Sequence, residues 1–450
     1  MNIQTVCDYL NKRLGINIRK DYYNDINLWD EWYKGYHRPF HHYVDYNGKE
    51  TVELDRYTLK MAKKVCEDWA NLLLNEKTVI VTQNEKANDY LKNVLDKNSF
   101  ISNANNLIEK TFALGTGAVL VKIIGGEVRL DYITADCIIP ISYDNRGISE
   151  VAFASAFNKK GREYTYVEIH LKDGKGNYVI KNECFDDCFN KAPLFEGVRD
   201  EVETNSPIPR FVIFKPNITN NIDSSSPMGV SVYGNSIDVL KGIDLAYDNL
   251  CTDFFLGGKM VMMNESIVAR EQNGERRAPQ FSKKRLFMSL GDSVIDGKMY
   301  EEYNPQLRVD ENVKGVQHQL NYLSSKCGLG ENFYNFEVSN VRTATEVVYS
   351  NASLFRSVRK HSNLLEAALK NLALAILSMV GFENEKITVI LDDSVIEDKS
   401  RQKEQDRADI AVGVMQKYEY RMKYYGETEE EAKLKTAEEK EKNEETQRNS

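Results

Sequence analysis

The chain has 450 residues, of which 42% are hydrophobic, and its formal net charge is −9. This length allows about three domains, and the acidic balance argues against a protein that coats nucleic acid with a basic surface. Seven scattered cysteines, an odd number, favour a reducing compartment over a disulfide framework. The N-terminus lacks a signal-peptide segment, and the most apolar run, Leu372 to Val380, is shorter than the roughly 20 residues that cross a bilayer. We therefore expect a soluble protein without an export signal.

Aromatic residues crowd the first 50 positions. Four of them have the spacing of one helical face: Trp29, Trp32, Tyr33 and Tyr36. Three histidines follow, at His37, His41 and His42. Because no cysteine or carboxylate completes a ligand set, aromatic packing is favoured over a metal site.

An amphipathic helix is predicted over residues 55–75, with Asp55 as a candidate N-cap. Its apolar face comprises Leu59, Ala62, Cys66, Trp69, Leu72 and Leu73. A strand from Thr78 to Thr82 and a helical segment over residues 85–114 are expected to follow.

A Gly-Thr-Gly sequence at residues 115–117 ends this segment and precedes a predicted hairpin that turns at Gly125-Gly126. The third glycine of a dinucleotide fingerprint is missing and no helix follows, so a nucleotide site is disfavoured. An antiparallel meander is predicted next. The strands of the hairpin and meander are Ala118 to Ile124, Glu127 to Tyr132, Glu150 to Phe157, Glu163 to Leu171 and Tyr178 to Asn182.

Residues 200–230 contain several prolines and a run of serines, which is typical of a linker. A helix of roughly 39 Å is predicted from Ser231 to Leu256, where it ends at Gly257-Gly258. Four carboxylates are displaced from its packing face: Asp238, Asp244, Asp248 and Asp253.

A small β-rich module is predicted over residues 259–309, with strands from Lys259 to Asn264 and from Ser293 to Tyr300. Its middle holds five basic residues: Arg276, Arg277, Lys283, Lys284 and Arg285. A second helix, from Asp310 to Cys327, has one apolar face and stops at a Gly-Leu-Gly sequence.

A helix of roughly 57 Å is predicted from Thr343 to Val380, with Thr343 and Glu346 at the spacing of a capping box. A basic patch interrupts its apolar face: Arg356, Arg359, Lys360 and His361. A strand from Ile387 to Leu391 and two helices over residues 393–426 follow. Residues 427–450 are almost wholly charged and are expected to be a solvated helix or disordered.

Several strings occur in the order that characterises the portal proteins of tailed bacteriophages. They are WYKG from Trp32 to Gly35, MAKKVCEDWANLLLNEK from Met61 to Lys77, and TATEV at the start of the long helix. The two helices that bracket a small β-rich module have the same order. From Trp32 to about Glu431, the chain therefore resembles this family, in particular the siphophage portals of low-GC Gram-positive hosts.

The resemblance implies an α+β portal fold assembled as a ring, with a wing of helices and antiparallel sheet, a two-helix stem, a small β-rich clip and a helical crown. The implied boundaries are the N-terminal wing at 1–230, the first stem helix at 231–258, the clip at 259–309, the second stem helix at 310–328, a tunnel loop at 329–342, the long helix and a wing strand at 343–392, the crown at 393–426 and a charged, disordered tail at 427–450.

The resemblance also implies a function. A ring of about twelve subunits at one capsid vertex would package, retain and later eject double-stranded DNA. Its implied partners are the terminase large subunit, a head-completion or adaptor protein, and the major capsid and scaffold proteins, with no membrane. Such a protein would assemble in the cytoplasm of the host bacterium and reside in the virion.

An acidic channel would repel the DNA backbone and keep it mobile, whereas lysines would bind phosphates and slow its passage. We therefore expect Asp238, Asp244 and Asp248 to line the stem tunnel. The alternative, with equal weight, is that they are solvated on the outside or pair with Lys241 and Lys314.

The tunnel loop is expected to touch passing DNA through Asn340, Val341 and Arg342. In the alternative, Arg342 pairs with Glu337 or Glu346 and only fixes the start of the helix. The clip is expected to present its basic residues, Arg276, Arg277, Lys283, Lys284 and Arg285, as a docking surface.

No catalytic residues, cofactor or metal are expected. The sequence lacks a phosphate-binding P-loop, a zinc-protease HExxH and a GxSxG nucleophile motif. Asp392, Asp393 and Asp398 are interpreted as a helix cap and solvated face rather than as metal ligands. The alternative function is a non-enzymatic structural or scaffolding component of a capsid, or of another large assembly, without a DNA channel.

Overall fold

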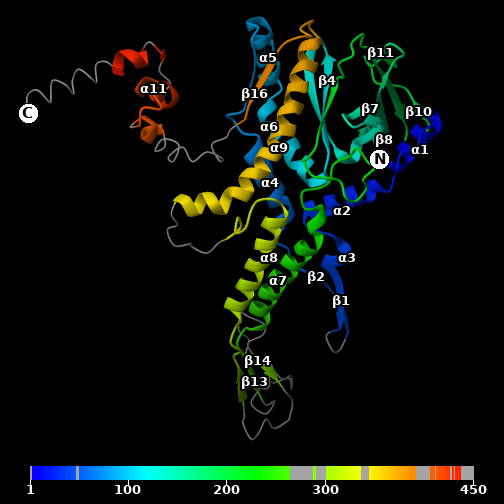
Figure 1. The fold of residues 1–450 in the computed structure, drawn as a ribbon. Coiled ribbons are helices and arrows are strands. Elements are labelled where there is room, and N and C mark those ends of the chain that lie inside the picture. Colours follow the sequence, from blue (N-terminus) through cyan, green and yellow to red (C-terminus); the bar gives the residue numbers. More distant parts are fainter. Residues whose placement is uncertain are drawn as a thin grey trace, which may run out of the picture. The chain divides into compact units, whose positions relative to one another are not determined.

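The computed structural model describes residues 3–46, 50–263, 287–289, 300–335, 344–391, 406–410, 412–425, 428–429 and 431–436. The chain divides into two units, Met1–Leu391 and Asp392–Ser450. The first unit combines helices with antiparallel sheets (Figure 1), which confirms the predicted α+β class.

Three helices and a hairpin form the N-terminal part: α1 (Ile3–Leu14), α2 (Tyr22–Lys34), α3 (Arg38–His41), β1 (His42–Tyr46) and β2 (Thr51–Asp55). The helix predicted from aromatic spacing is α2, which buries Trp29 and Trp32 and ends at the left-handed Gly35. The hairpin was not predicted. Asp55, the expected cap of the next helix, is instead the last residue of β2.

The next helices are α4 (Met61–Leu73), α5 (Glu85–Lys97) and α6 (Phe100–Leu114). Residues 85–114 are therefore two helices rather than one, because Ser99 adopts a left-handed conformation with φ of 47°. Trp69 of α4 is fully buried, stacks on Phe112 of α6 and donates a 3.0 Å hydrogen bond to the Cys327 carbonyl. Two segments far apart in the sequence are thereby joined in one core.

A three-stranded antiparallel sheet has the order β12–β4–β5, from Phe211–Phe214, Gly117–Ile124 and Glu127–Thr134. The prediction that residues 200–230 are a linker was wrong. β12 pairs along β4 and buries Phe211 and Phe214. The prolines that suggested a linker lie outside this four-residue strand.

The predicted meander is confirmed as β6 (Ile138–Asp144), β7 (Gly147–Lys159), β8 (Arg162–Lys172) and β9 (Tyr178–Phe185), preceded by the 3-10 turn η1 (Ala135–Cys137). Two short strands, β10 (Lys191–Ala192) and β11 (Glu201–Glu203), both pair with β9. β3 (Val79–Thr82) pairs with β16 (Ile387–Ile390) in a separate two-stranded sheet. Both strands were predicted, but their pairing was not.

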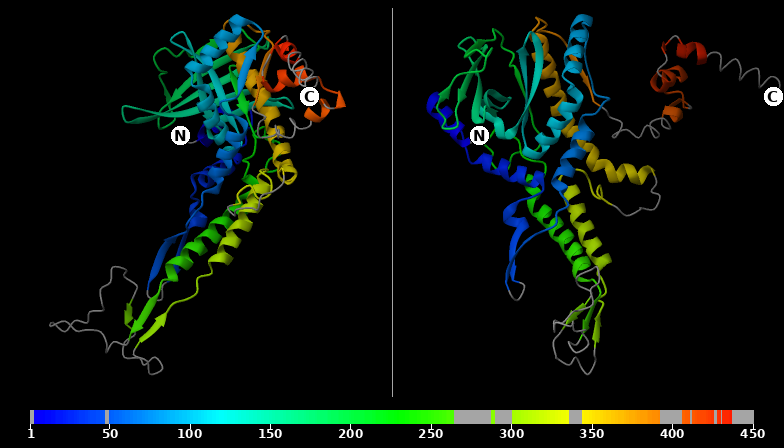
Figure 2. Two further views of the ribbon diagram at one scale, coloured as in Figure 1. Left: turned by 90° about the vertical axis from the view of Figure 1, so that its left-hand side faces the viewer. Right: turned by 180° about the vertical axis from the view of Figure 1, so that it is seen from behind.

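A pair of helices extends from this part: α7 (Ile237–Leu256) and α8 (Val309–Lys326) run side by side (Figures 1 and 2). They bracket a small sheet of order β14–β13–β15, from Phe287–Ser289, Met260–Met263 and Tyr300–Tyr303. The helix–sheet–helix order is as predicted. Of the strand predicted from Ser293 to Tyr300, only Tyr300 lies within the described residues, where β15 begins. One bound differs: α7 begins at Ile237 after the 3-10 turn η2 (Gly234–Ser236) rather than at Ser231.

The long helix is α9 (Ala344–Ser378), 35 residues in one run. Its first turns lie at an angle to the remainder (Figures 1 and 2). Leu369, Leu372 and Ile376 are buried against the sheets. His361, predicted to belong to a basic patch, is buried between Trp69 and Phe112, with ring centroids 4.7 and 5.0 Å away.

The second unit contains helical residues 406–410, α11 (Lys417–Tyr425) and helical residues 431–436. Asp406 accepts a 2.7 Å ion pair from Lys423 and a 2.7 Å hydrogen bond from the Tyr424 hydroxyl. In the tail, Ala432 is fully buried, although an apolar contact was not expected there.

Burial gives His361 a protonation-dependent role in stability. Burial, and then the charge of Lys360, lower the pKa of His361 from 6.5 to about 4. Its Nδ1 accepts a 3.0 Å hydrogen bond from the Asn217 N–H. The neutral ring therefore stabilises the fold above pH 6.5, and this stabilisation is lost as the pH falls from 6.5 towards 4.

We predict that the unfolding free energy of the wild type falls by about 2 kcal/mol between pH 6.5 and 4.5 because of His361. The variant His361→Gln, which keeps an acceptor for Asn217, should not show this decrease. Urea unfolding followed by tryptophan fluorescence at both pH values measures this difference. An unchanged pH dependence in His361→Gln would contradict the assignment.

Candidate functional site

The helix pair α7–α8 is the candidate functional element, because the sequence analysis places the channel there. Gly242 permits close approach of the helices: a Cβ at this position would lie 2.9 Å from Oε1 of Gln319. Near the small sheet, Asp253 of α7 binds Arg308 at 2.9 Å and Asn312 at 2.7 Å. These bonds lower the pKa of Asp253, so the carboxylate stays charged and fixes the register of the pair.

Asp244, in the middle of α7, connects this helix pair to the N-terminal part. Its carboxylate accepts hydrogen bonds from the Leu59 N–H at 2.9 Å, the Thr58 hydroxyl at 3.0 Å and Nε2 of His41 at 3.1 Å. The Nδ1 of His41 lies 2.8 Å from the His37 N–H. Both side chains are buried, with Asp244 only 4% exposed. Residues on both sides of the β1–β2 hairpin are thus tied to one carboxylate.

The prediction that Asp244 lines a channel is therefore wrong for this residue. A carboxylate that is withdrawn from solvent by its own chain and satisfied by three donors cannot form part of an aqueous wall. The residue lies off the main apolar face of α7, as its sequence position indicated. His41, Thr58 and Leu59 cover this side of α7, however, and the spacing of residues along α7 does not reveal them.

The other two carboxylates of the predicted tunnel lining differ from each other. Asp248 is half-buried and accepts a 2.9 Å hydrogen bond from the Tyr57 N–H. The side chain of Asp238 is 93% exposed and pairs with Lys241 at 3.0 Å, one of the pairings left open by the sequence. Among the three, Asp238 is the carboxylate that presents its charge to solvent.

The segment after α8 is anchored to the core. Tyr334 is buried, its hydroxyl donates a 2.9 Å hydrogen bond to Asp68, and its carbonyl accepts one of 3.0 Å from Gln317. Burial, followed by the charge of Asp68, raises the pKa of Tyr334. Tyr334 therefore fixes the start of the predicted tunnel loop, whereas Phe333 is exposed. Asn340, Val341 and Arg342 lie outside the described residues.

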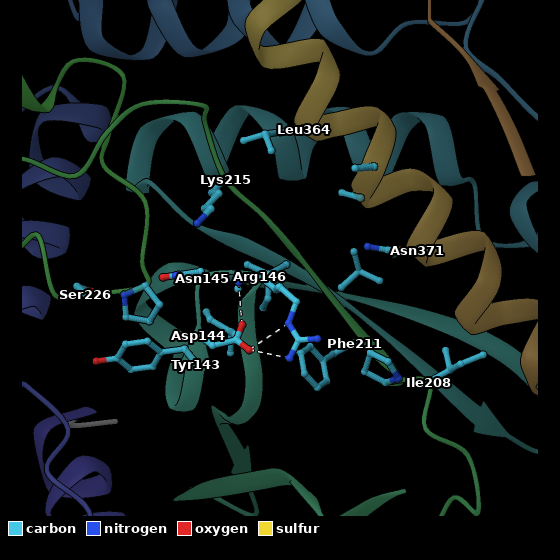
Figure 3. Close-up of a pocket in the computed structure, with 18 of the residues that line it drawn as sticks. Tyr143, Asp144, Asn145, Arg146, Ile208, Phe211, Lys215, Ser226, Leu364 and Asn371 are labelled. Atoms are coloured by element: carbon cyan, nitrogen blue, oxygen red, sulfur yellow. Dashed lines mark hydrogen bonds and ion pairs between the residues drawn. The ribbon is translucent and has the colours of Figure 1, made fainter. Parts of the chain in front are cut away.

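A cavity of about 900 Å³ opens between α9, the β6–β7 turn and the segment around β12. Figure 3 shows Asp144 and Arg146 on the turn, joined by a 2.9 Å ion pair, with Lys215, Leu364 and Asn371 across the opening. The side chain of Arg146 is 92% exposed.

The described residues contain no cluster of three or more His, Cys, Asp or Glu side chains placed to hold a metal ion. In the same part of the chain, no helix is both long and apolar enough to cross a bilayer. All seven cysteines are free thiols.

Comparison with known families decides the identity. A family model described as "Phage portal protein, SPP1 Gp6-like" matches residues 14–447. The chain belongs to this family of phage portal proteins. No match was found among curated proteins. The family is one of structural proteins of the phage capsid.

Two functional features of this portal escaped the sequence analysis. The His41–Asp244 pair joins residues 203 positions apart, and His41 was interpreted only as part of an aromatic cluster. The hairpin β1–β2 was missed although β2 alternates, with Val52 and Leu54 on one face and polar residues on the other. β1 does not alternate, since Tyr43 and Tyr46 lie on opposite faces. The five basic residues expected on the clip, from Arg276 to Arg285, lie outside the described residues.

We predict that Asp244→Ala lowers the unfolding free energy by about 3 kcal/mol, because three buried donors lose their acceptor together. Asp238→Ala, on the same helix but exposed, should change it by less than about 0.5 kcal/mol. Chemical denaturation of both variants, followed by tryptophan fluorescence, makes the comparison. Equal stability of the two would show that the Asp244 junction contributes nothing to the fold.

Proposed function

We propose that this portal protein forms a closed ring at one capsid vertex, through which double-stranded DNA is packaged, retained and ejected. The family match over residues 14–447 carries this proposal. The ring would contain about twelve subunits. Terminase large subunit, and later a head-completion or adaptor protein, would dock on the clip, with the major capsid and scaffold proteins around the wing.

The stem supports assembly on physical grounds. Its far end exposes two large apolar side chains, Phe254 and Leu256. Further along α7, Leu245 is also exposed. Contiguous apolar surface of this kind marks a protein interface, and a head-to-tail contact that closes on itself generates a ring.

The channel wall is assigned more narrowly than the sequence suggested. Asp238 remains the candidate lining residue, because its carboxylate reaches solvent whereas Asp244 is buried and Asp248 is bonded to Tyr57. A ring of such carboxylates would repel phosphates and keep DNA centred, since no counterions are released to hold it. In this proposal Asn340, Val341 and Arg342 of the tunnel loop touch passing DNA, and the basic residues of the clip dock its partners.

The alternative is a structural component of a large assembly that has no DNA channel. The two proposals differ in the shape of the assembly. A portal must close around a hole wide enough for a duplex, whereas a scaffold need not close.

We predict that the purified chain forms particles of several hundred kilodaltons that negative-stain images show as rings with a central hole. Light scattering across a range of protein and salt concentrations measures their mass. The same measurement is repeated after the chain is mixed with scaffold and capsid proteins. A mass of 51.6 kDa, that of a monomer, in every one of these preparations would contradict the portal function. Closed particles without a hole would favour the alternative.

A further inference from the structure

The hairpin β1–β2 leaves apolar side chains uncovered on both of its faces. Val44 and Tyr46 are 59% and 65% exposed on one face, and Leu54 is 38% exposed on the other. A two-stranded hairpin without packing is marginally stable at best in water. Its exposed apolar residues therefore indicate that another surface covers it in the assembled protein.

The position of the hairpin is fixed at its base. His41, just before β1, and Thr58 and Leu59, just after β2, bind Asp244 in the middle of α7. The hairpin consequently runs beside α7, on the side away from α8, as all views show (Figures 1 and 2). The hairpin and α8 therefore lie on opposite sides of α7.

The opposite flank carries a row of exposed side chains on α8 at intervals of four residues, which places them along one side of the helix. They are Lys314, His318, Tyr322 and Lys326. Leu320 and Leu323 on the other side of α8 are buried. Within the described part of the chain, Lys314 has no ion-pair partner, and Lys326 reaches only the Asn235 carbonyl at 3.4 Å.

Charge and length make the two flanks complementary. The hairpin sequence from His42 to Asp55 contains four carboxylates, Asp45, Glu50, Glu53 and Asp55, against one lysine, Lys49. Each five-residue strand spans about 17 Å at about 3.4 Å per residue. The row from Lys314 to Lys326 spans about 18 Å at about 1.5 Å per residue, so a strand and the row could lie along each other over their full lengths.

We propose that the acidic hairpin of one subunit lies along the basic row of α8 of its neighbour in the ring. The proposal rests on the ring assembly proposed above and names the surfaces that form the contact. Glu53 faces the same side as Val44, its cross-strand partner, so one face supplies both charge and apolar area. Val44 and Tyr46 would be covered by the Tyr322 ring and the lysine stems, which bury apolar surface while their charges pair.

A charge exchange in the full-length chain tests the pairing. Glu53→Lys and Lys314→Glu should each raise the protein concentration for half-assembly by about fivefold, because each places like charges together. The double variant, which keeps the net charge of the wild type, should return to within about twofold of it. Mass photometry over a dilution series measures the half-assembly concentration.

A second variant separates assembly from folding. Val44→Ser with Tyr46→Ser should leave the far-ultraviolet circular dichroism of the dissociated chain unchanged and reduce ring formation at least about tenfold, because these side chains are exposed in one chain and covered in the ring. Glu203→Lys, on the exposed strand β11, is the charge-matched control for Glu53→Lys and should assemble as the wild type.

The outcomes are distinct. Failure of the wild-type chain to form rings would overturn the proposed function, and the contact with it. Rings that form normally in both single variants would overturn the contact alone, and reduced DNA packaging by those intact rings would assign the α8 row to the channel. Impaired single variants without recovery in the double variant would contradict the pairing of hairpin and α8.

Discussion

One chain of this protein cannot bury the apolar side chains of its own stem. Two helices in contact cover one face of each other, and Val44, Tyr46 and Leu245 remain exposed in the single chain. Burial of apolar area is the main favourable term in association. The architecture of the stem therefore favours neighbours, and the ring proposed for this portal would supply them as further copies of the same chain.

Such an assembly needs stems that are held at a fixed angle to the rest of the subunit. The Asp244 junction provides this constraint, since a single buried carboxylate binds both ends of the hairpin to the middle of α7. Trp69 likewise fixes the end of α8 to the core, because its indole N–H donates a hydrogen bond to the Cys327 carbonyl. Buried polar contacts are directional, so they specify orientation where apolar packing alone would allow sliding.

The sequence predicted the features that depend on local periodicity: the meander, the separate strands β3 and β16, and the two helices around a small sheet. It failed where a distant segment decides. Asp244 reads as a solvated carboxylate until His41 and Thr58 are placed over it, and His361 reads as a surface cation until Trp69 and Phe112 enclose it. β12 was obscured because flanking prolines suggested a linker, although its four residues pair with β4. Spacing along one element cannot report what covers that element.

The most direct test of this account is a three-dimensional reconstruction of the purified assembly by cryo-electron microscopy. We predict α7–α8 pairs side by side around a central hole, with the hairpin of each subunit against α8 of the next and Asp238 on the wall of the hole. Stems that point away from one another, with their apolar side chains still in solvent, would contradict it.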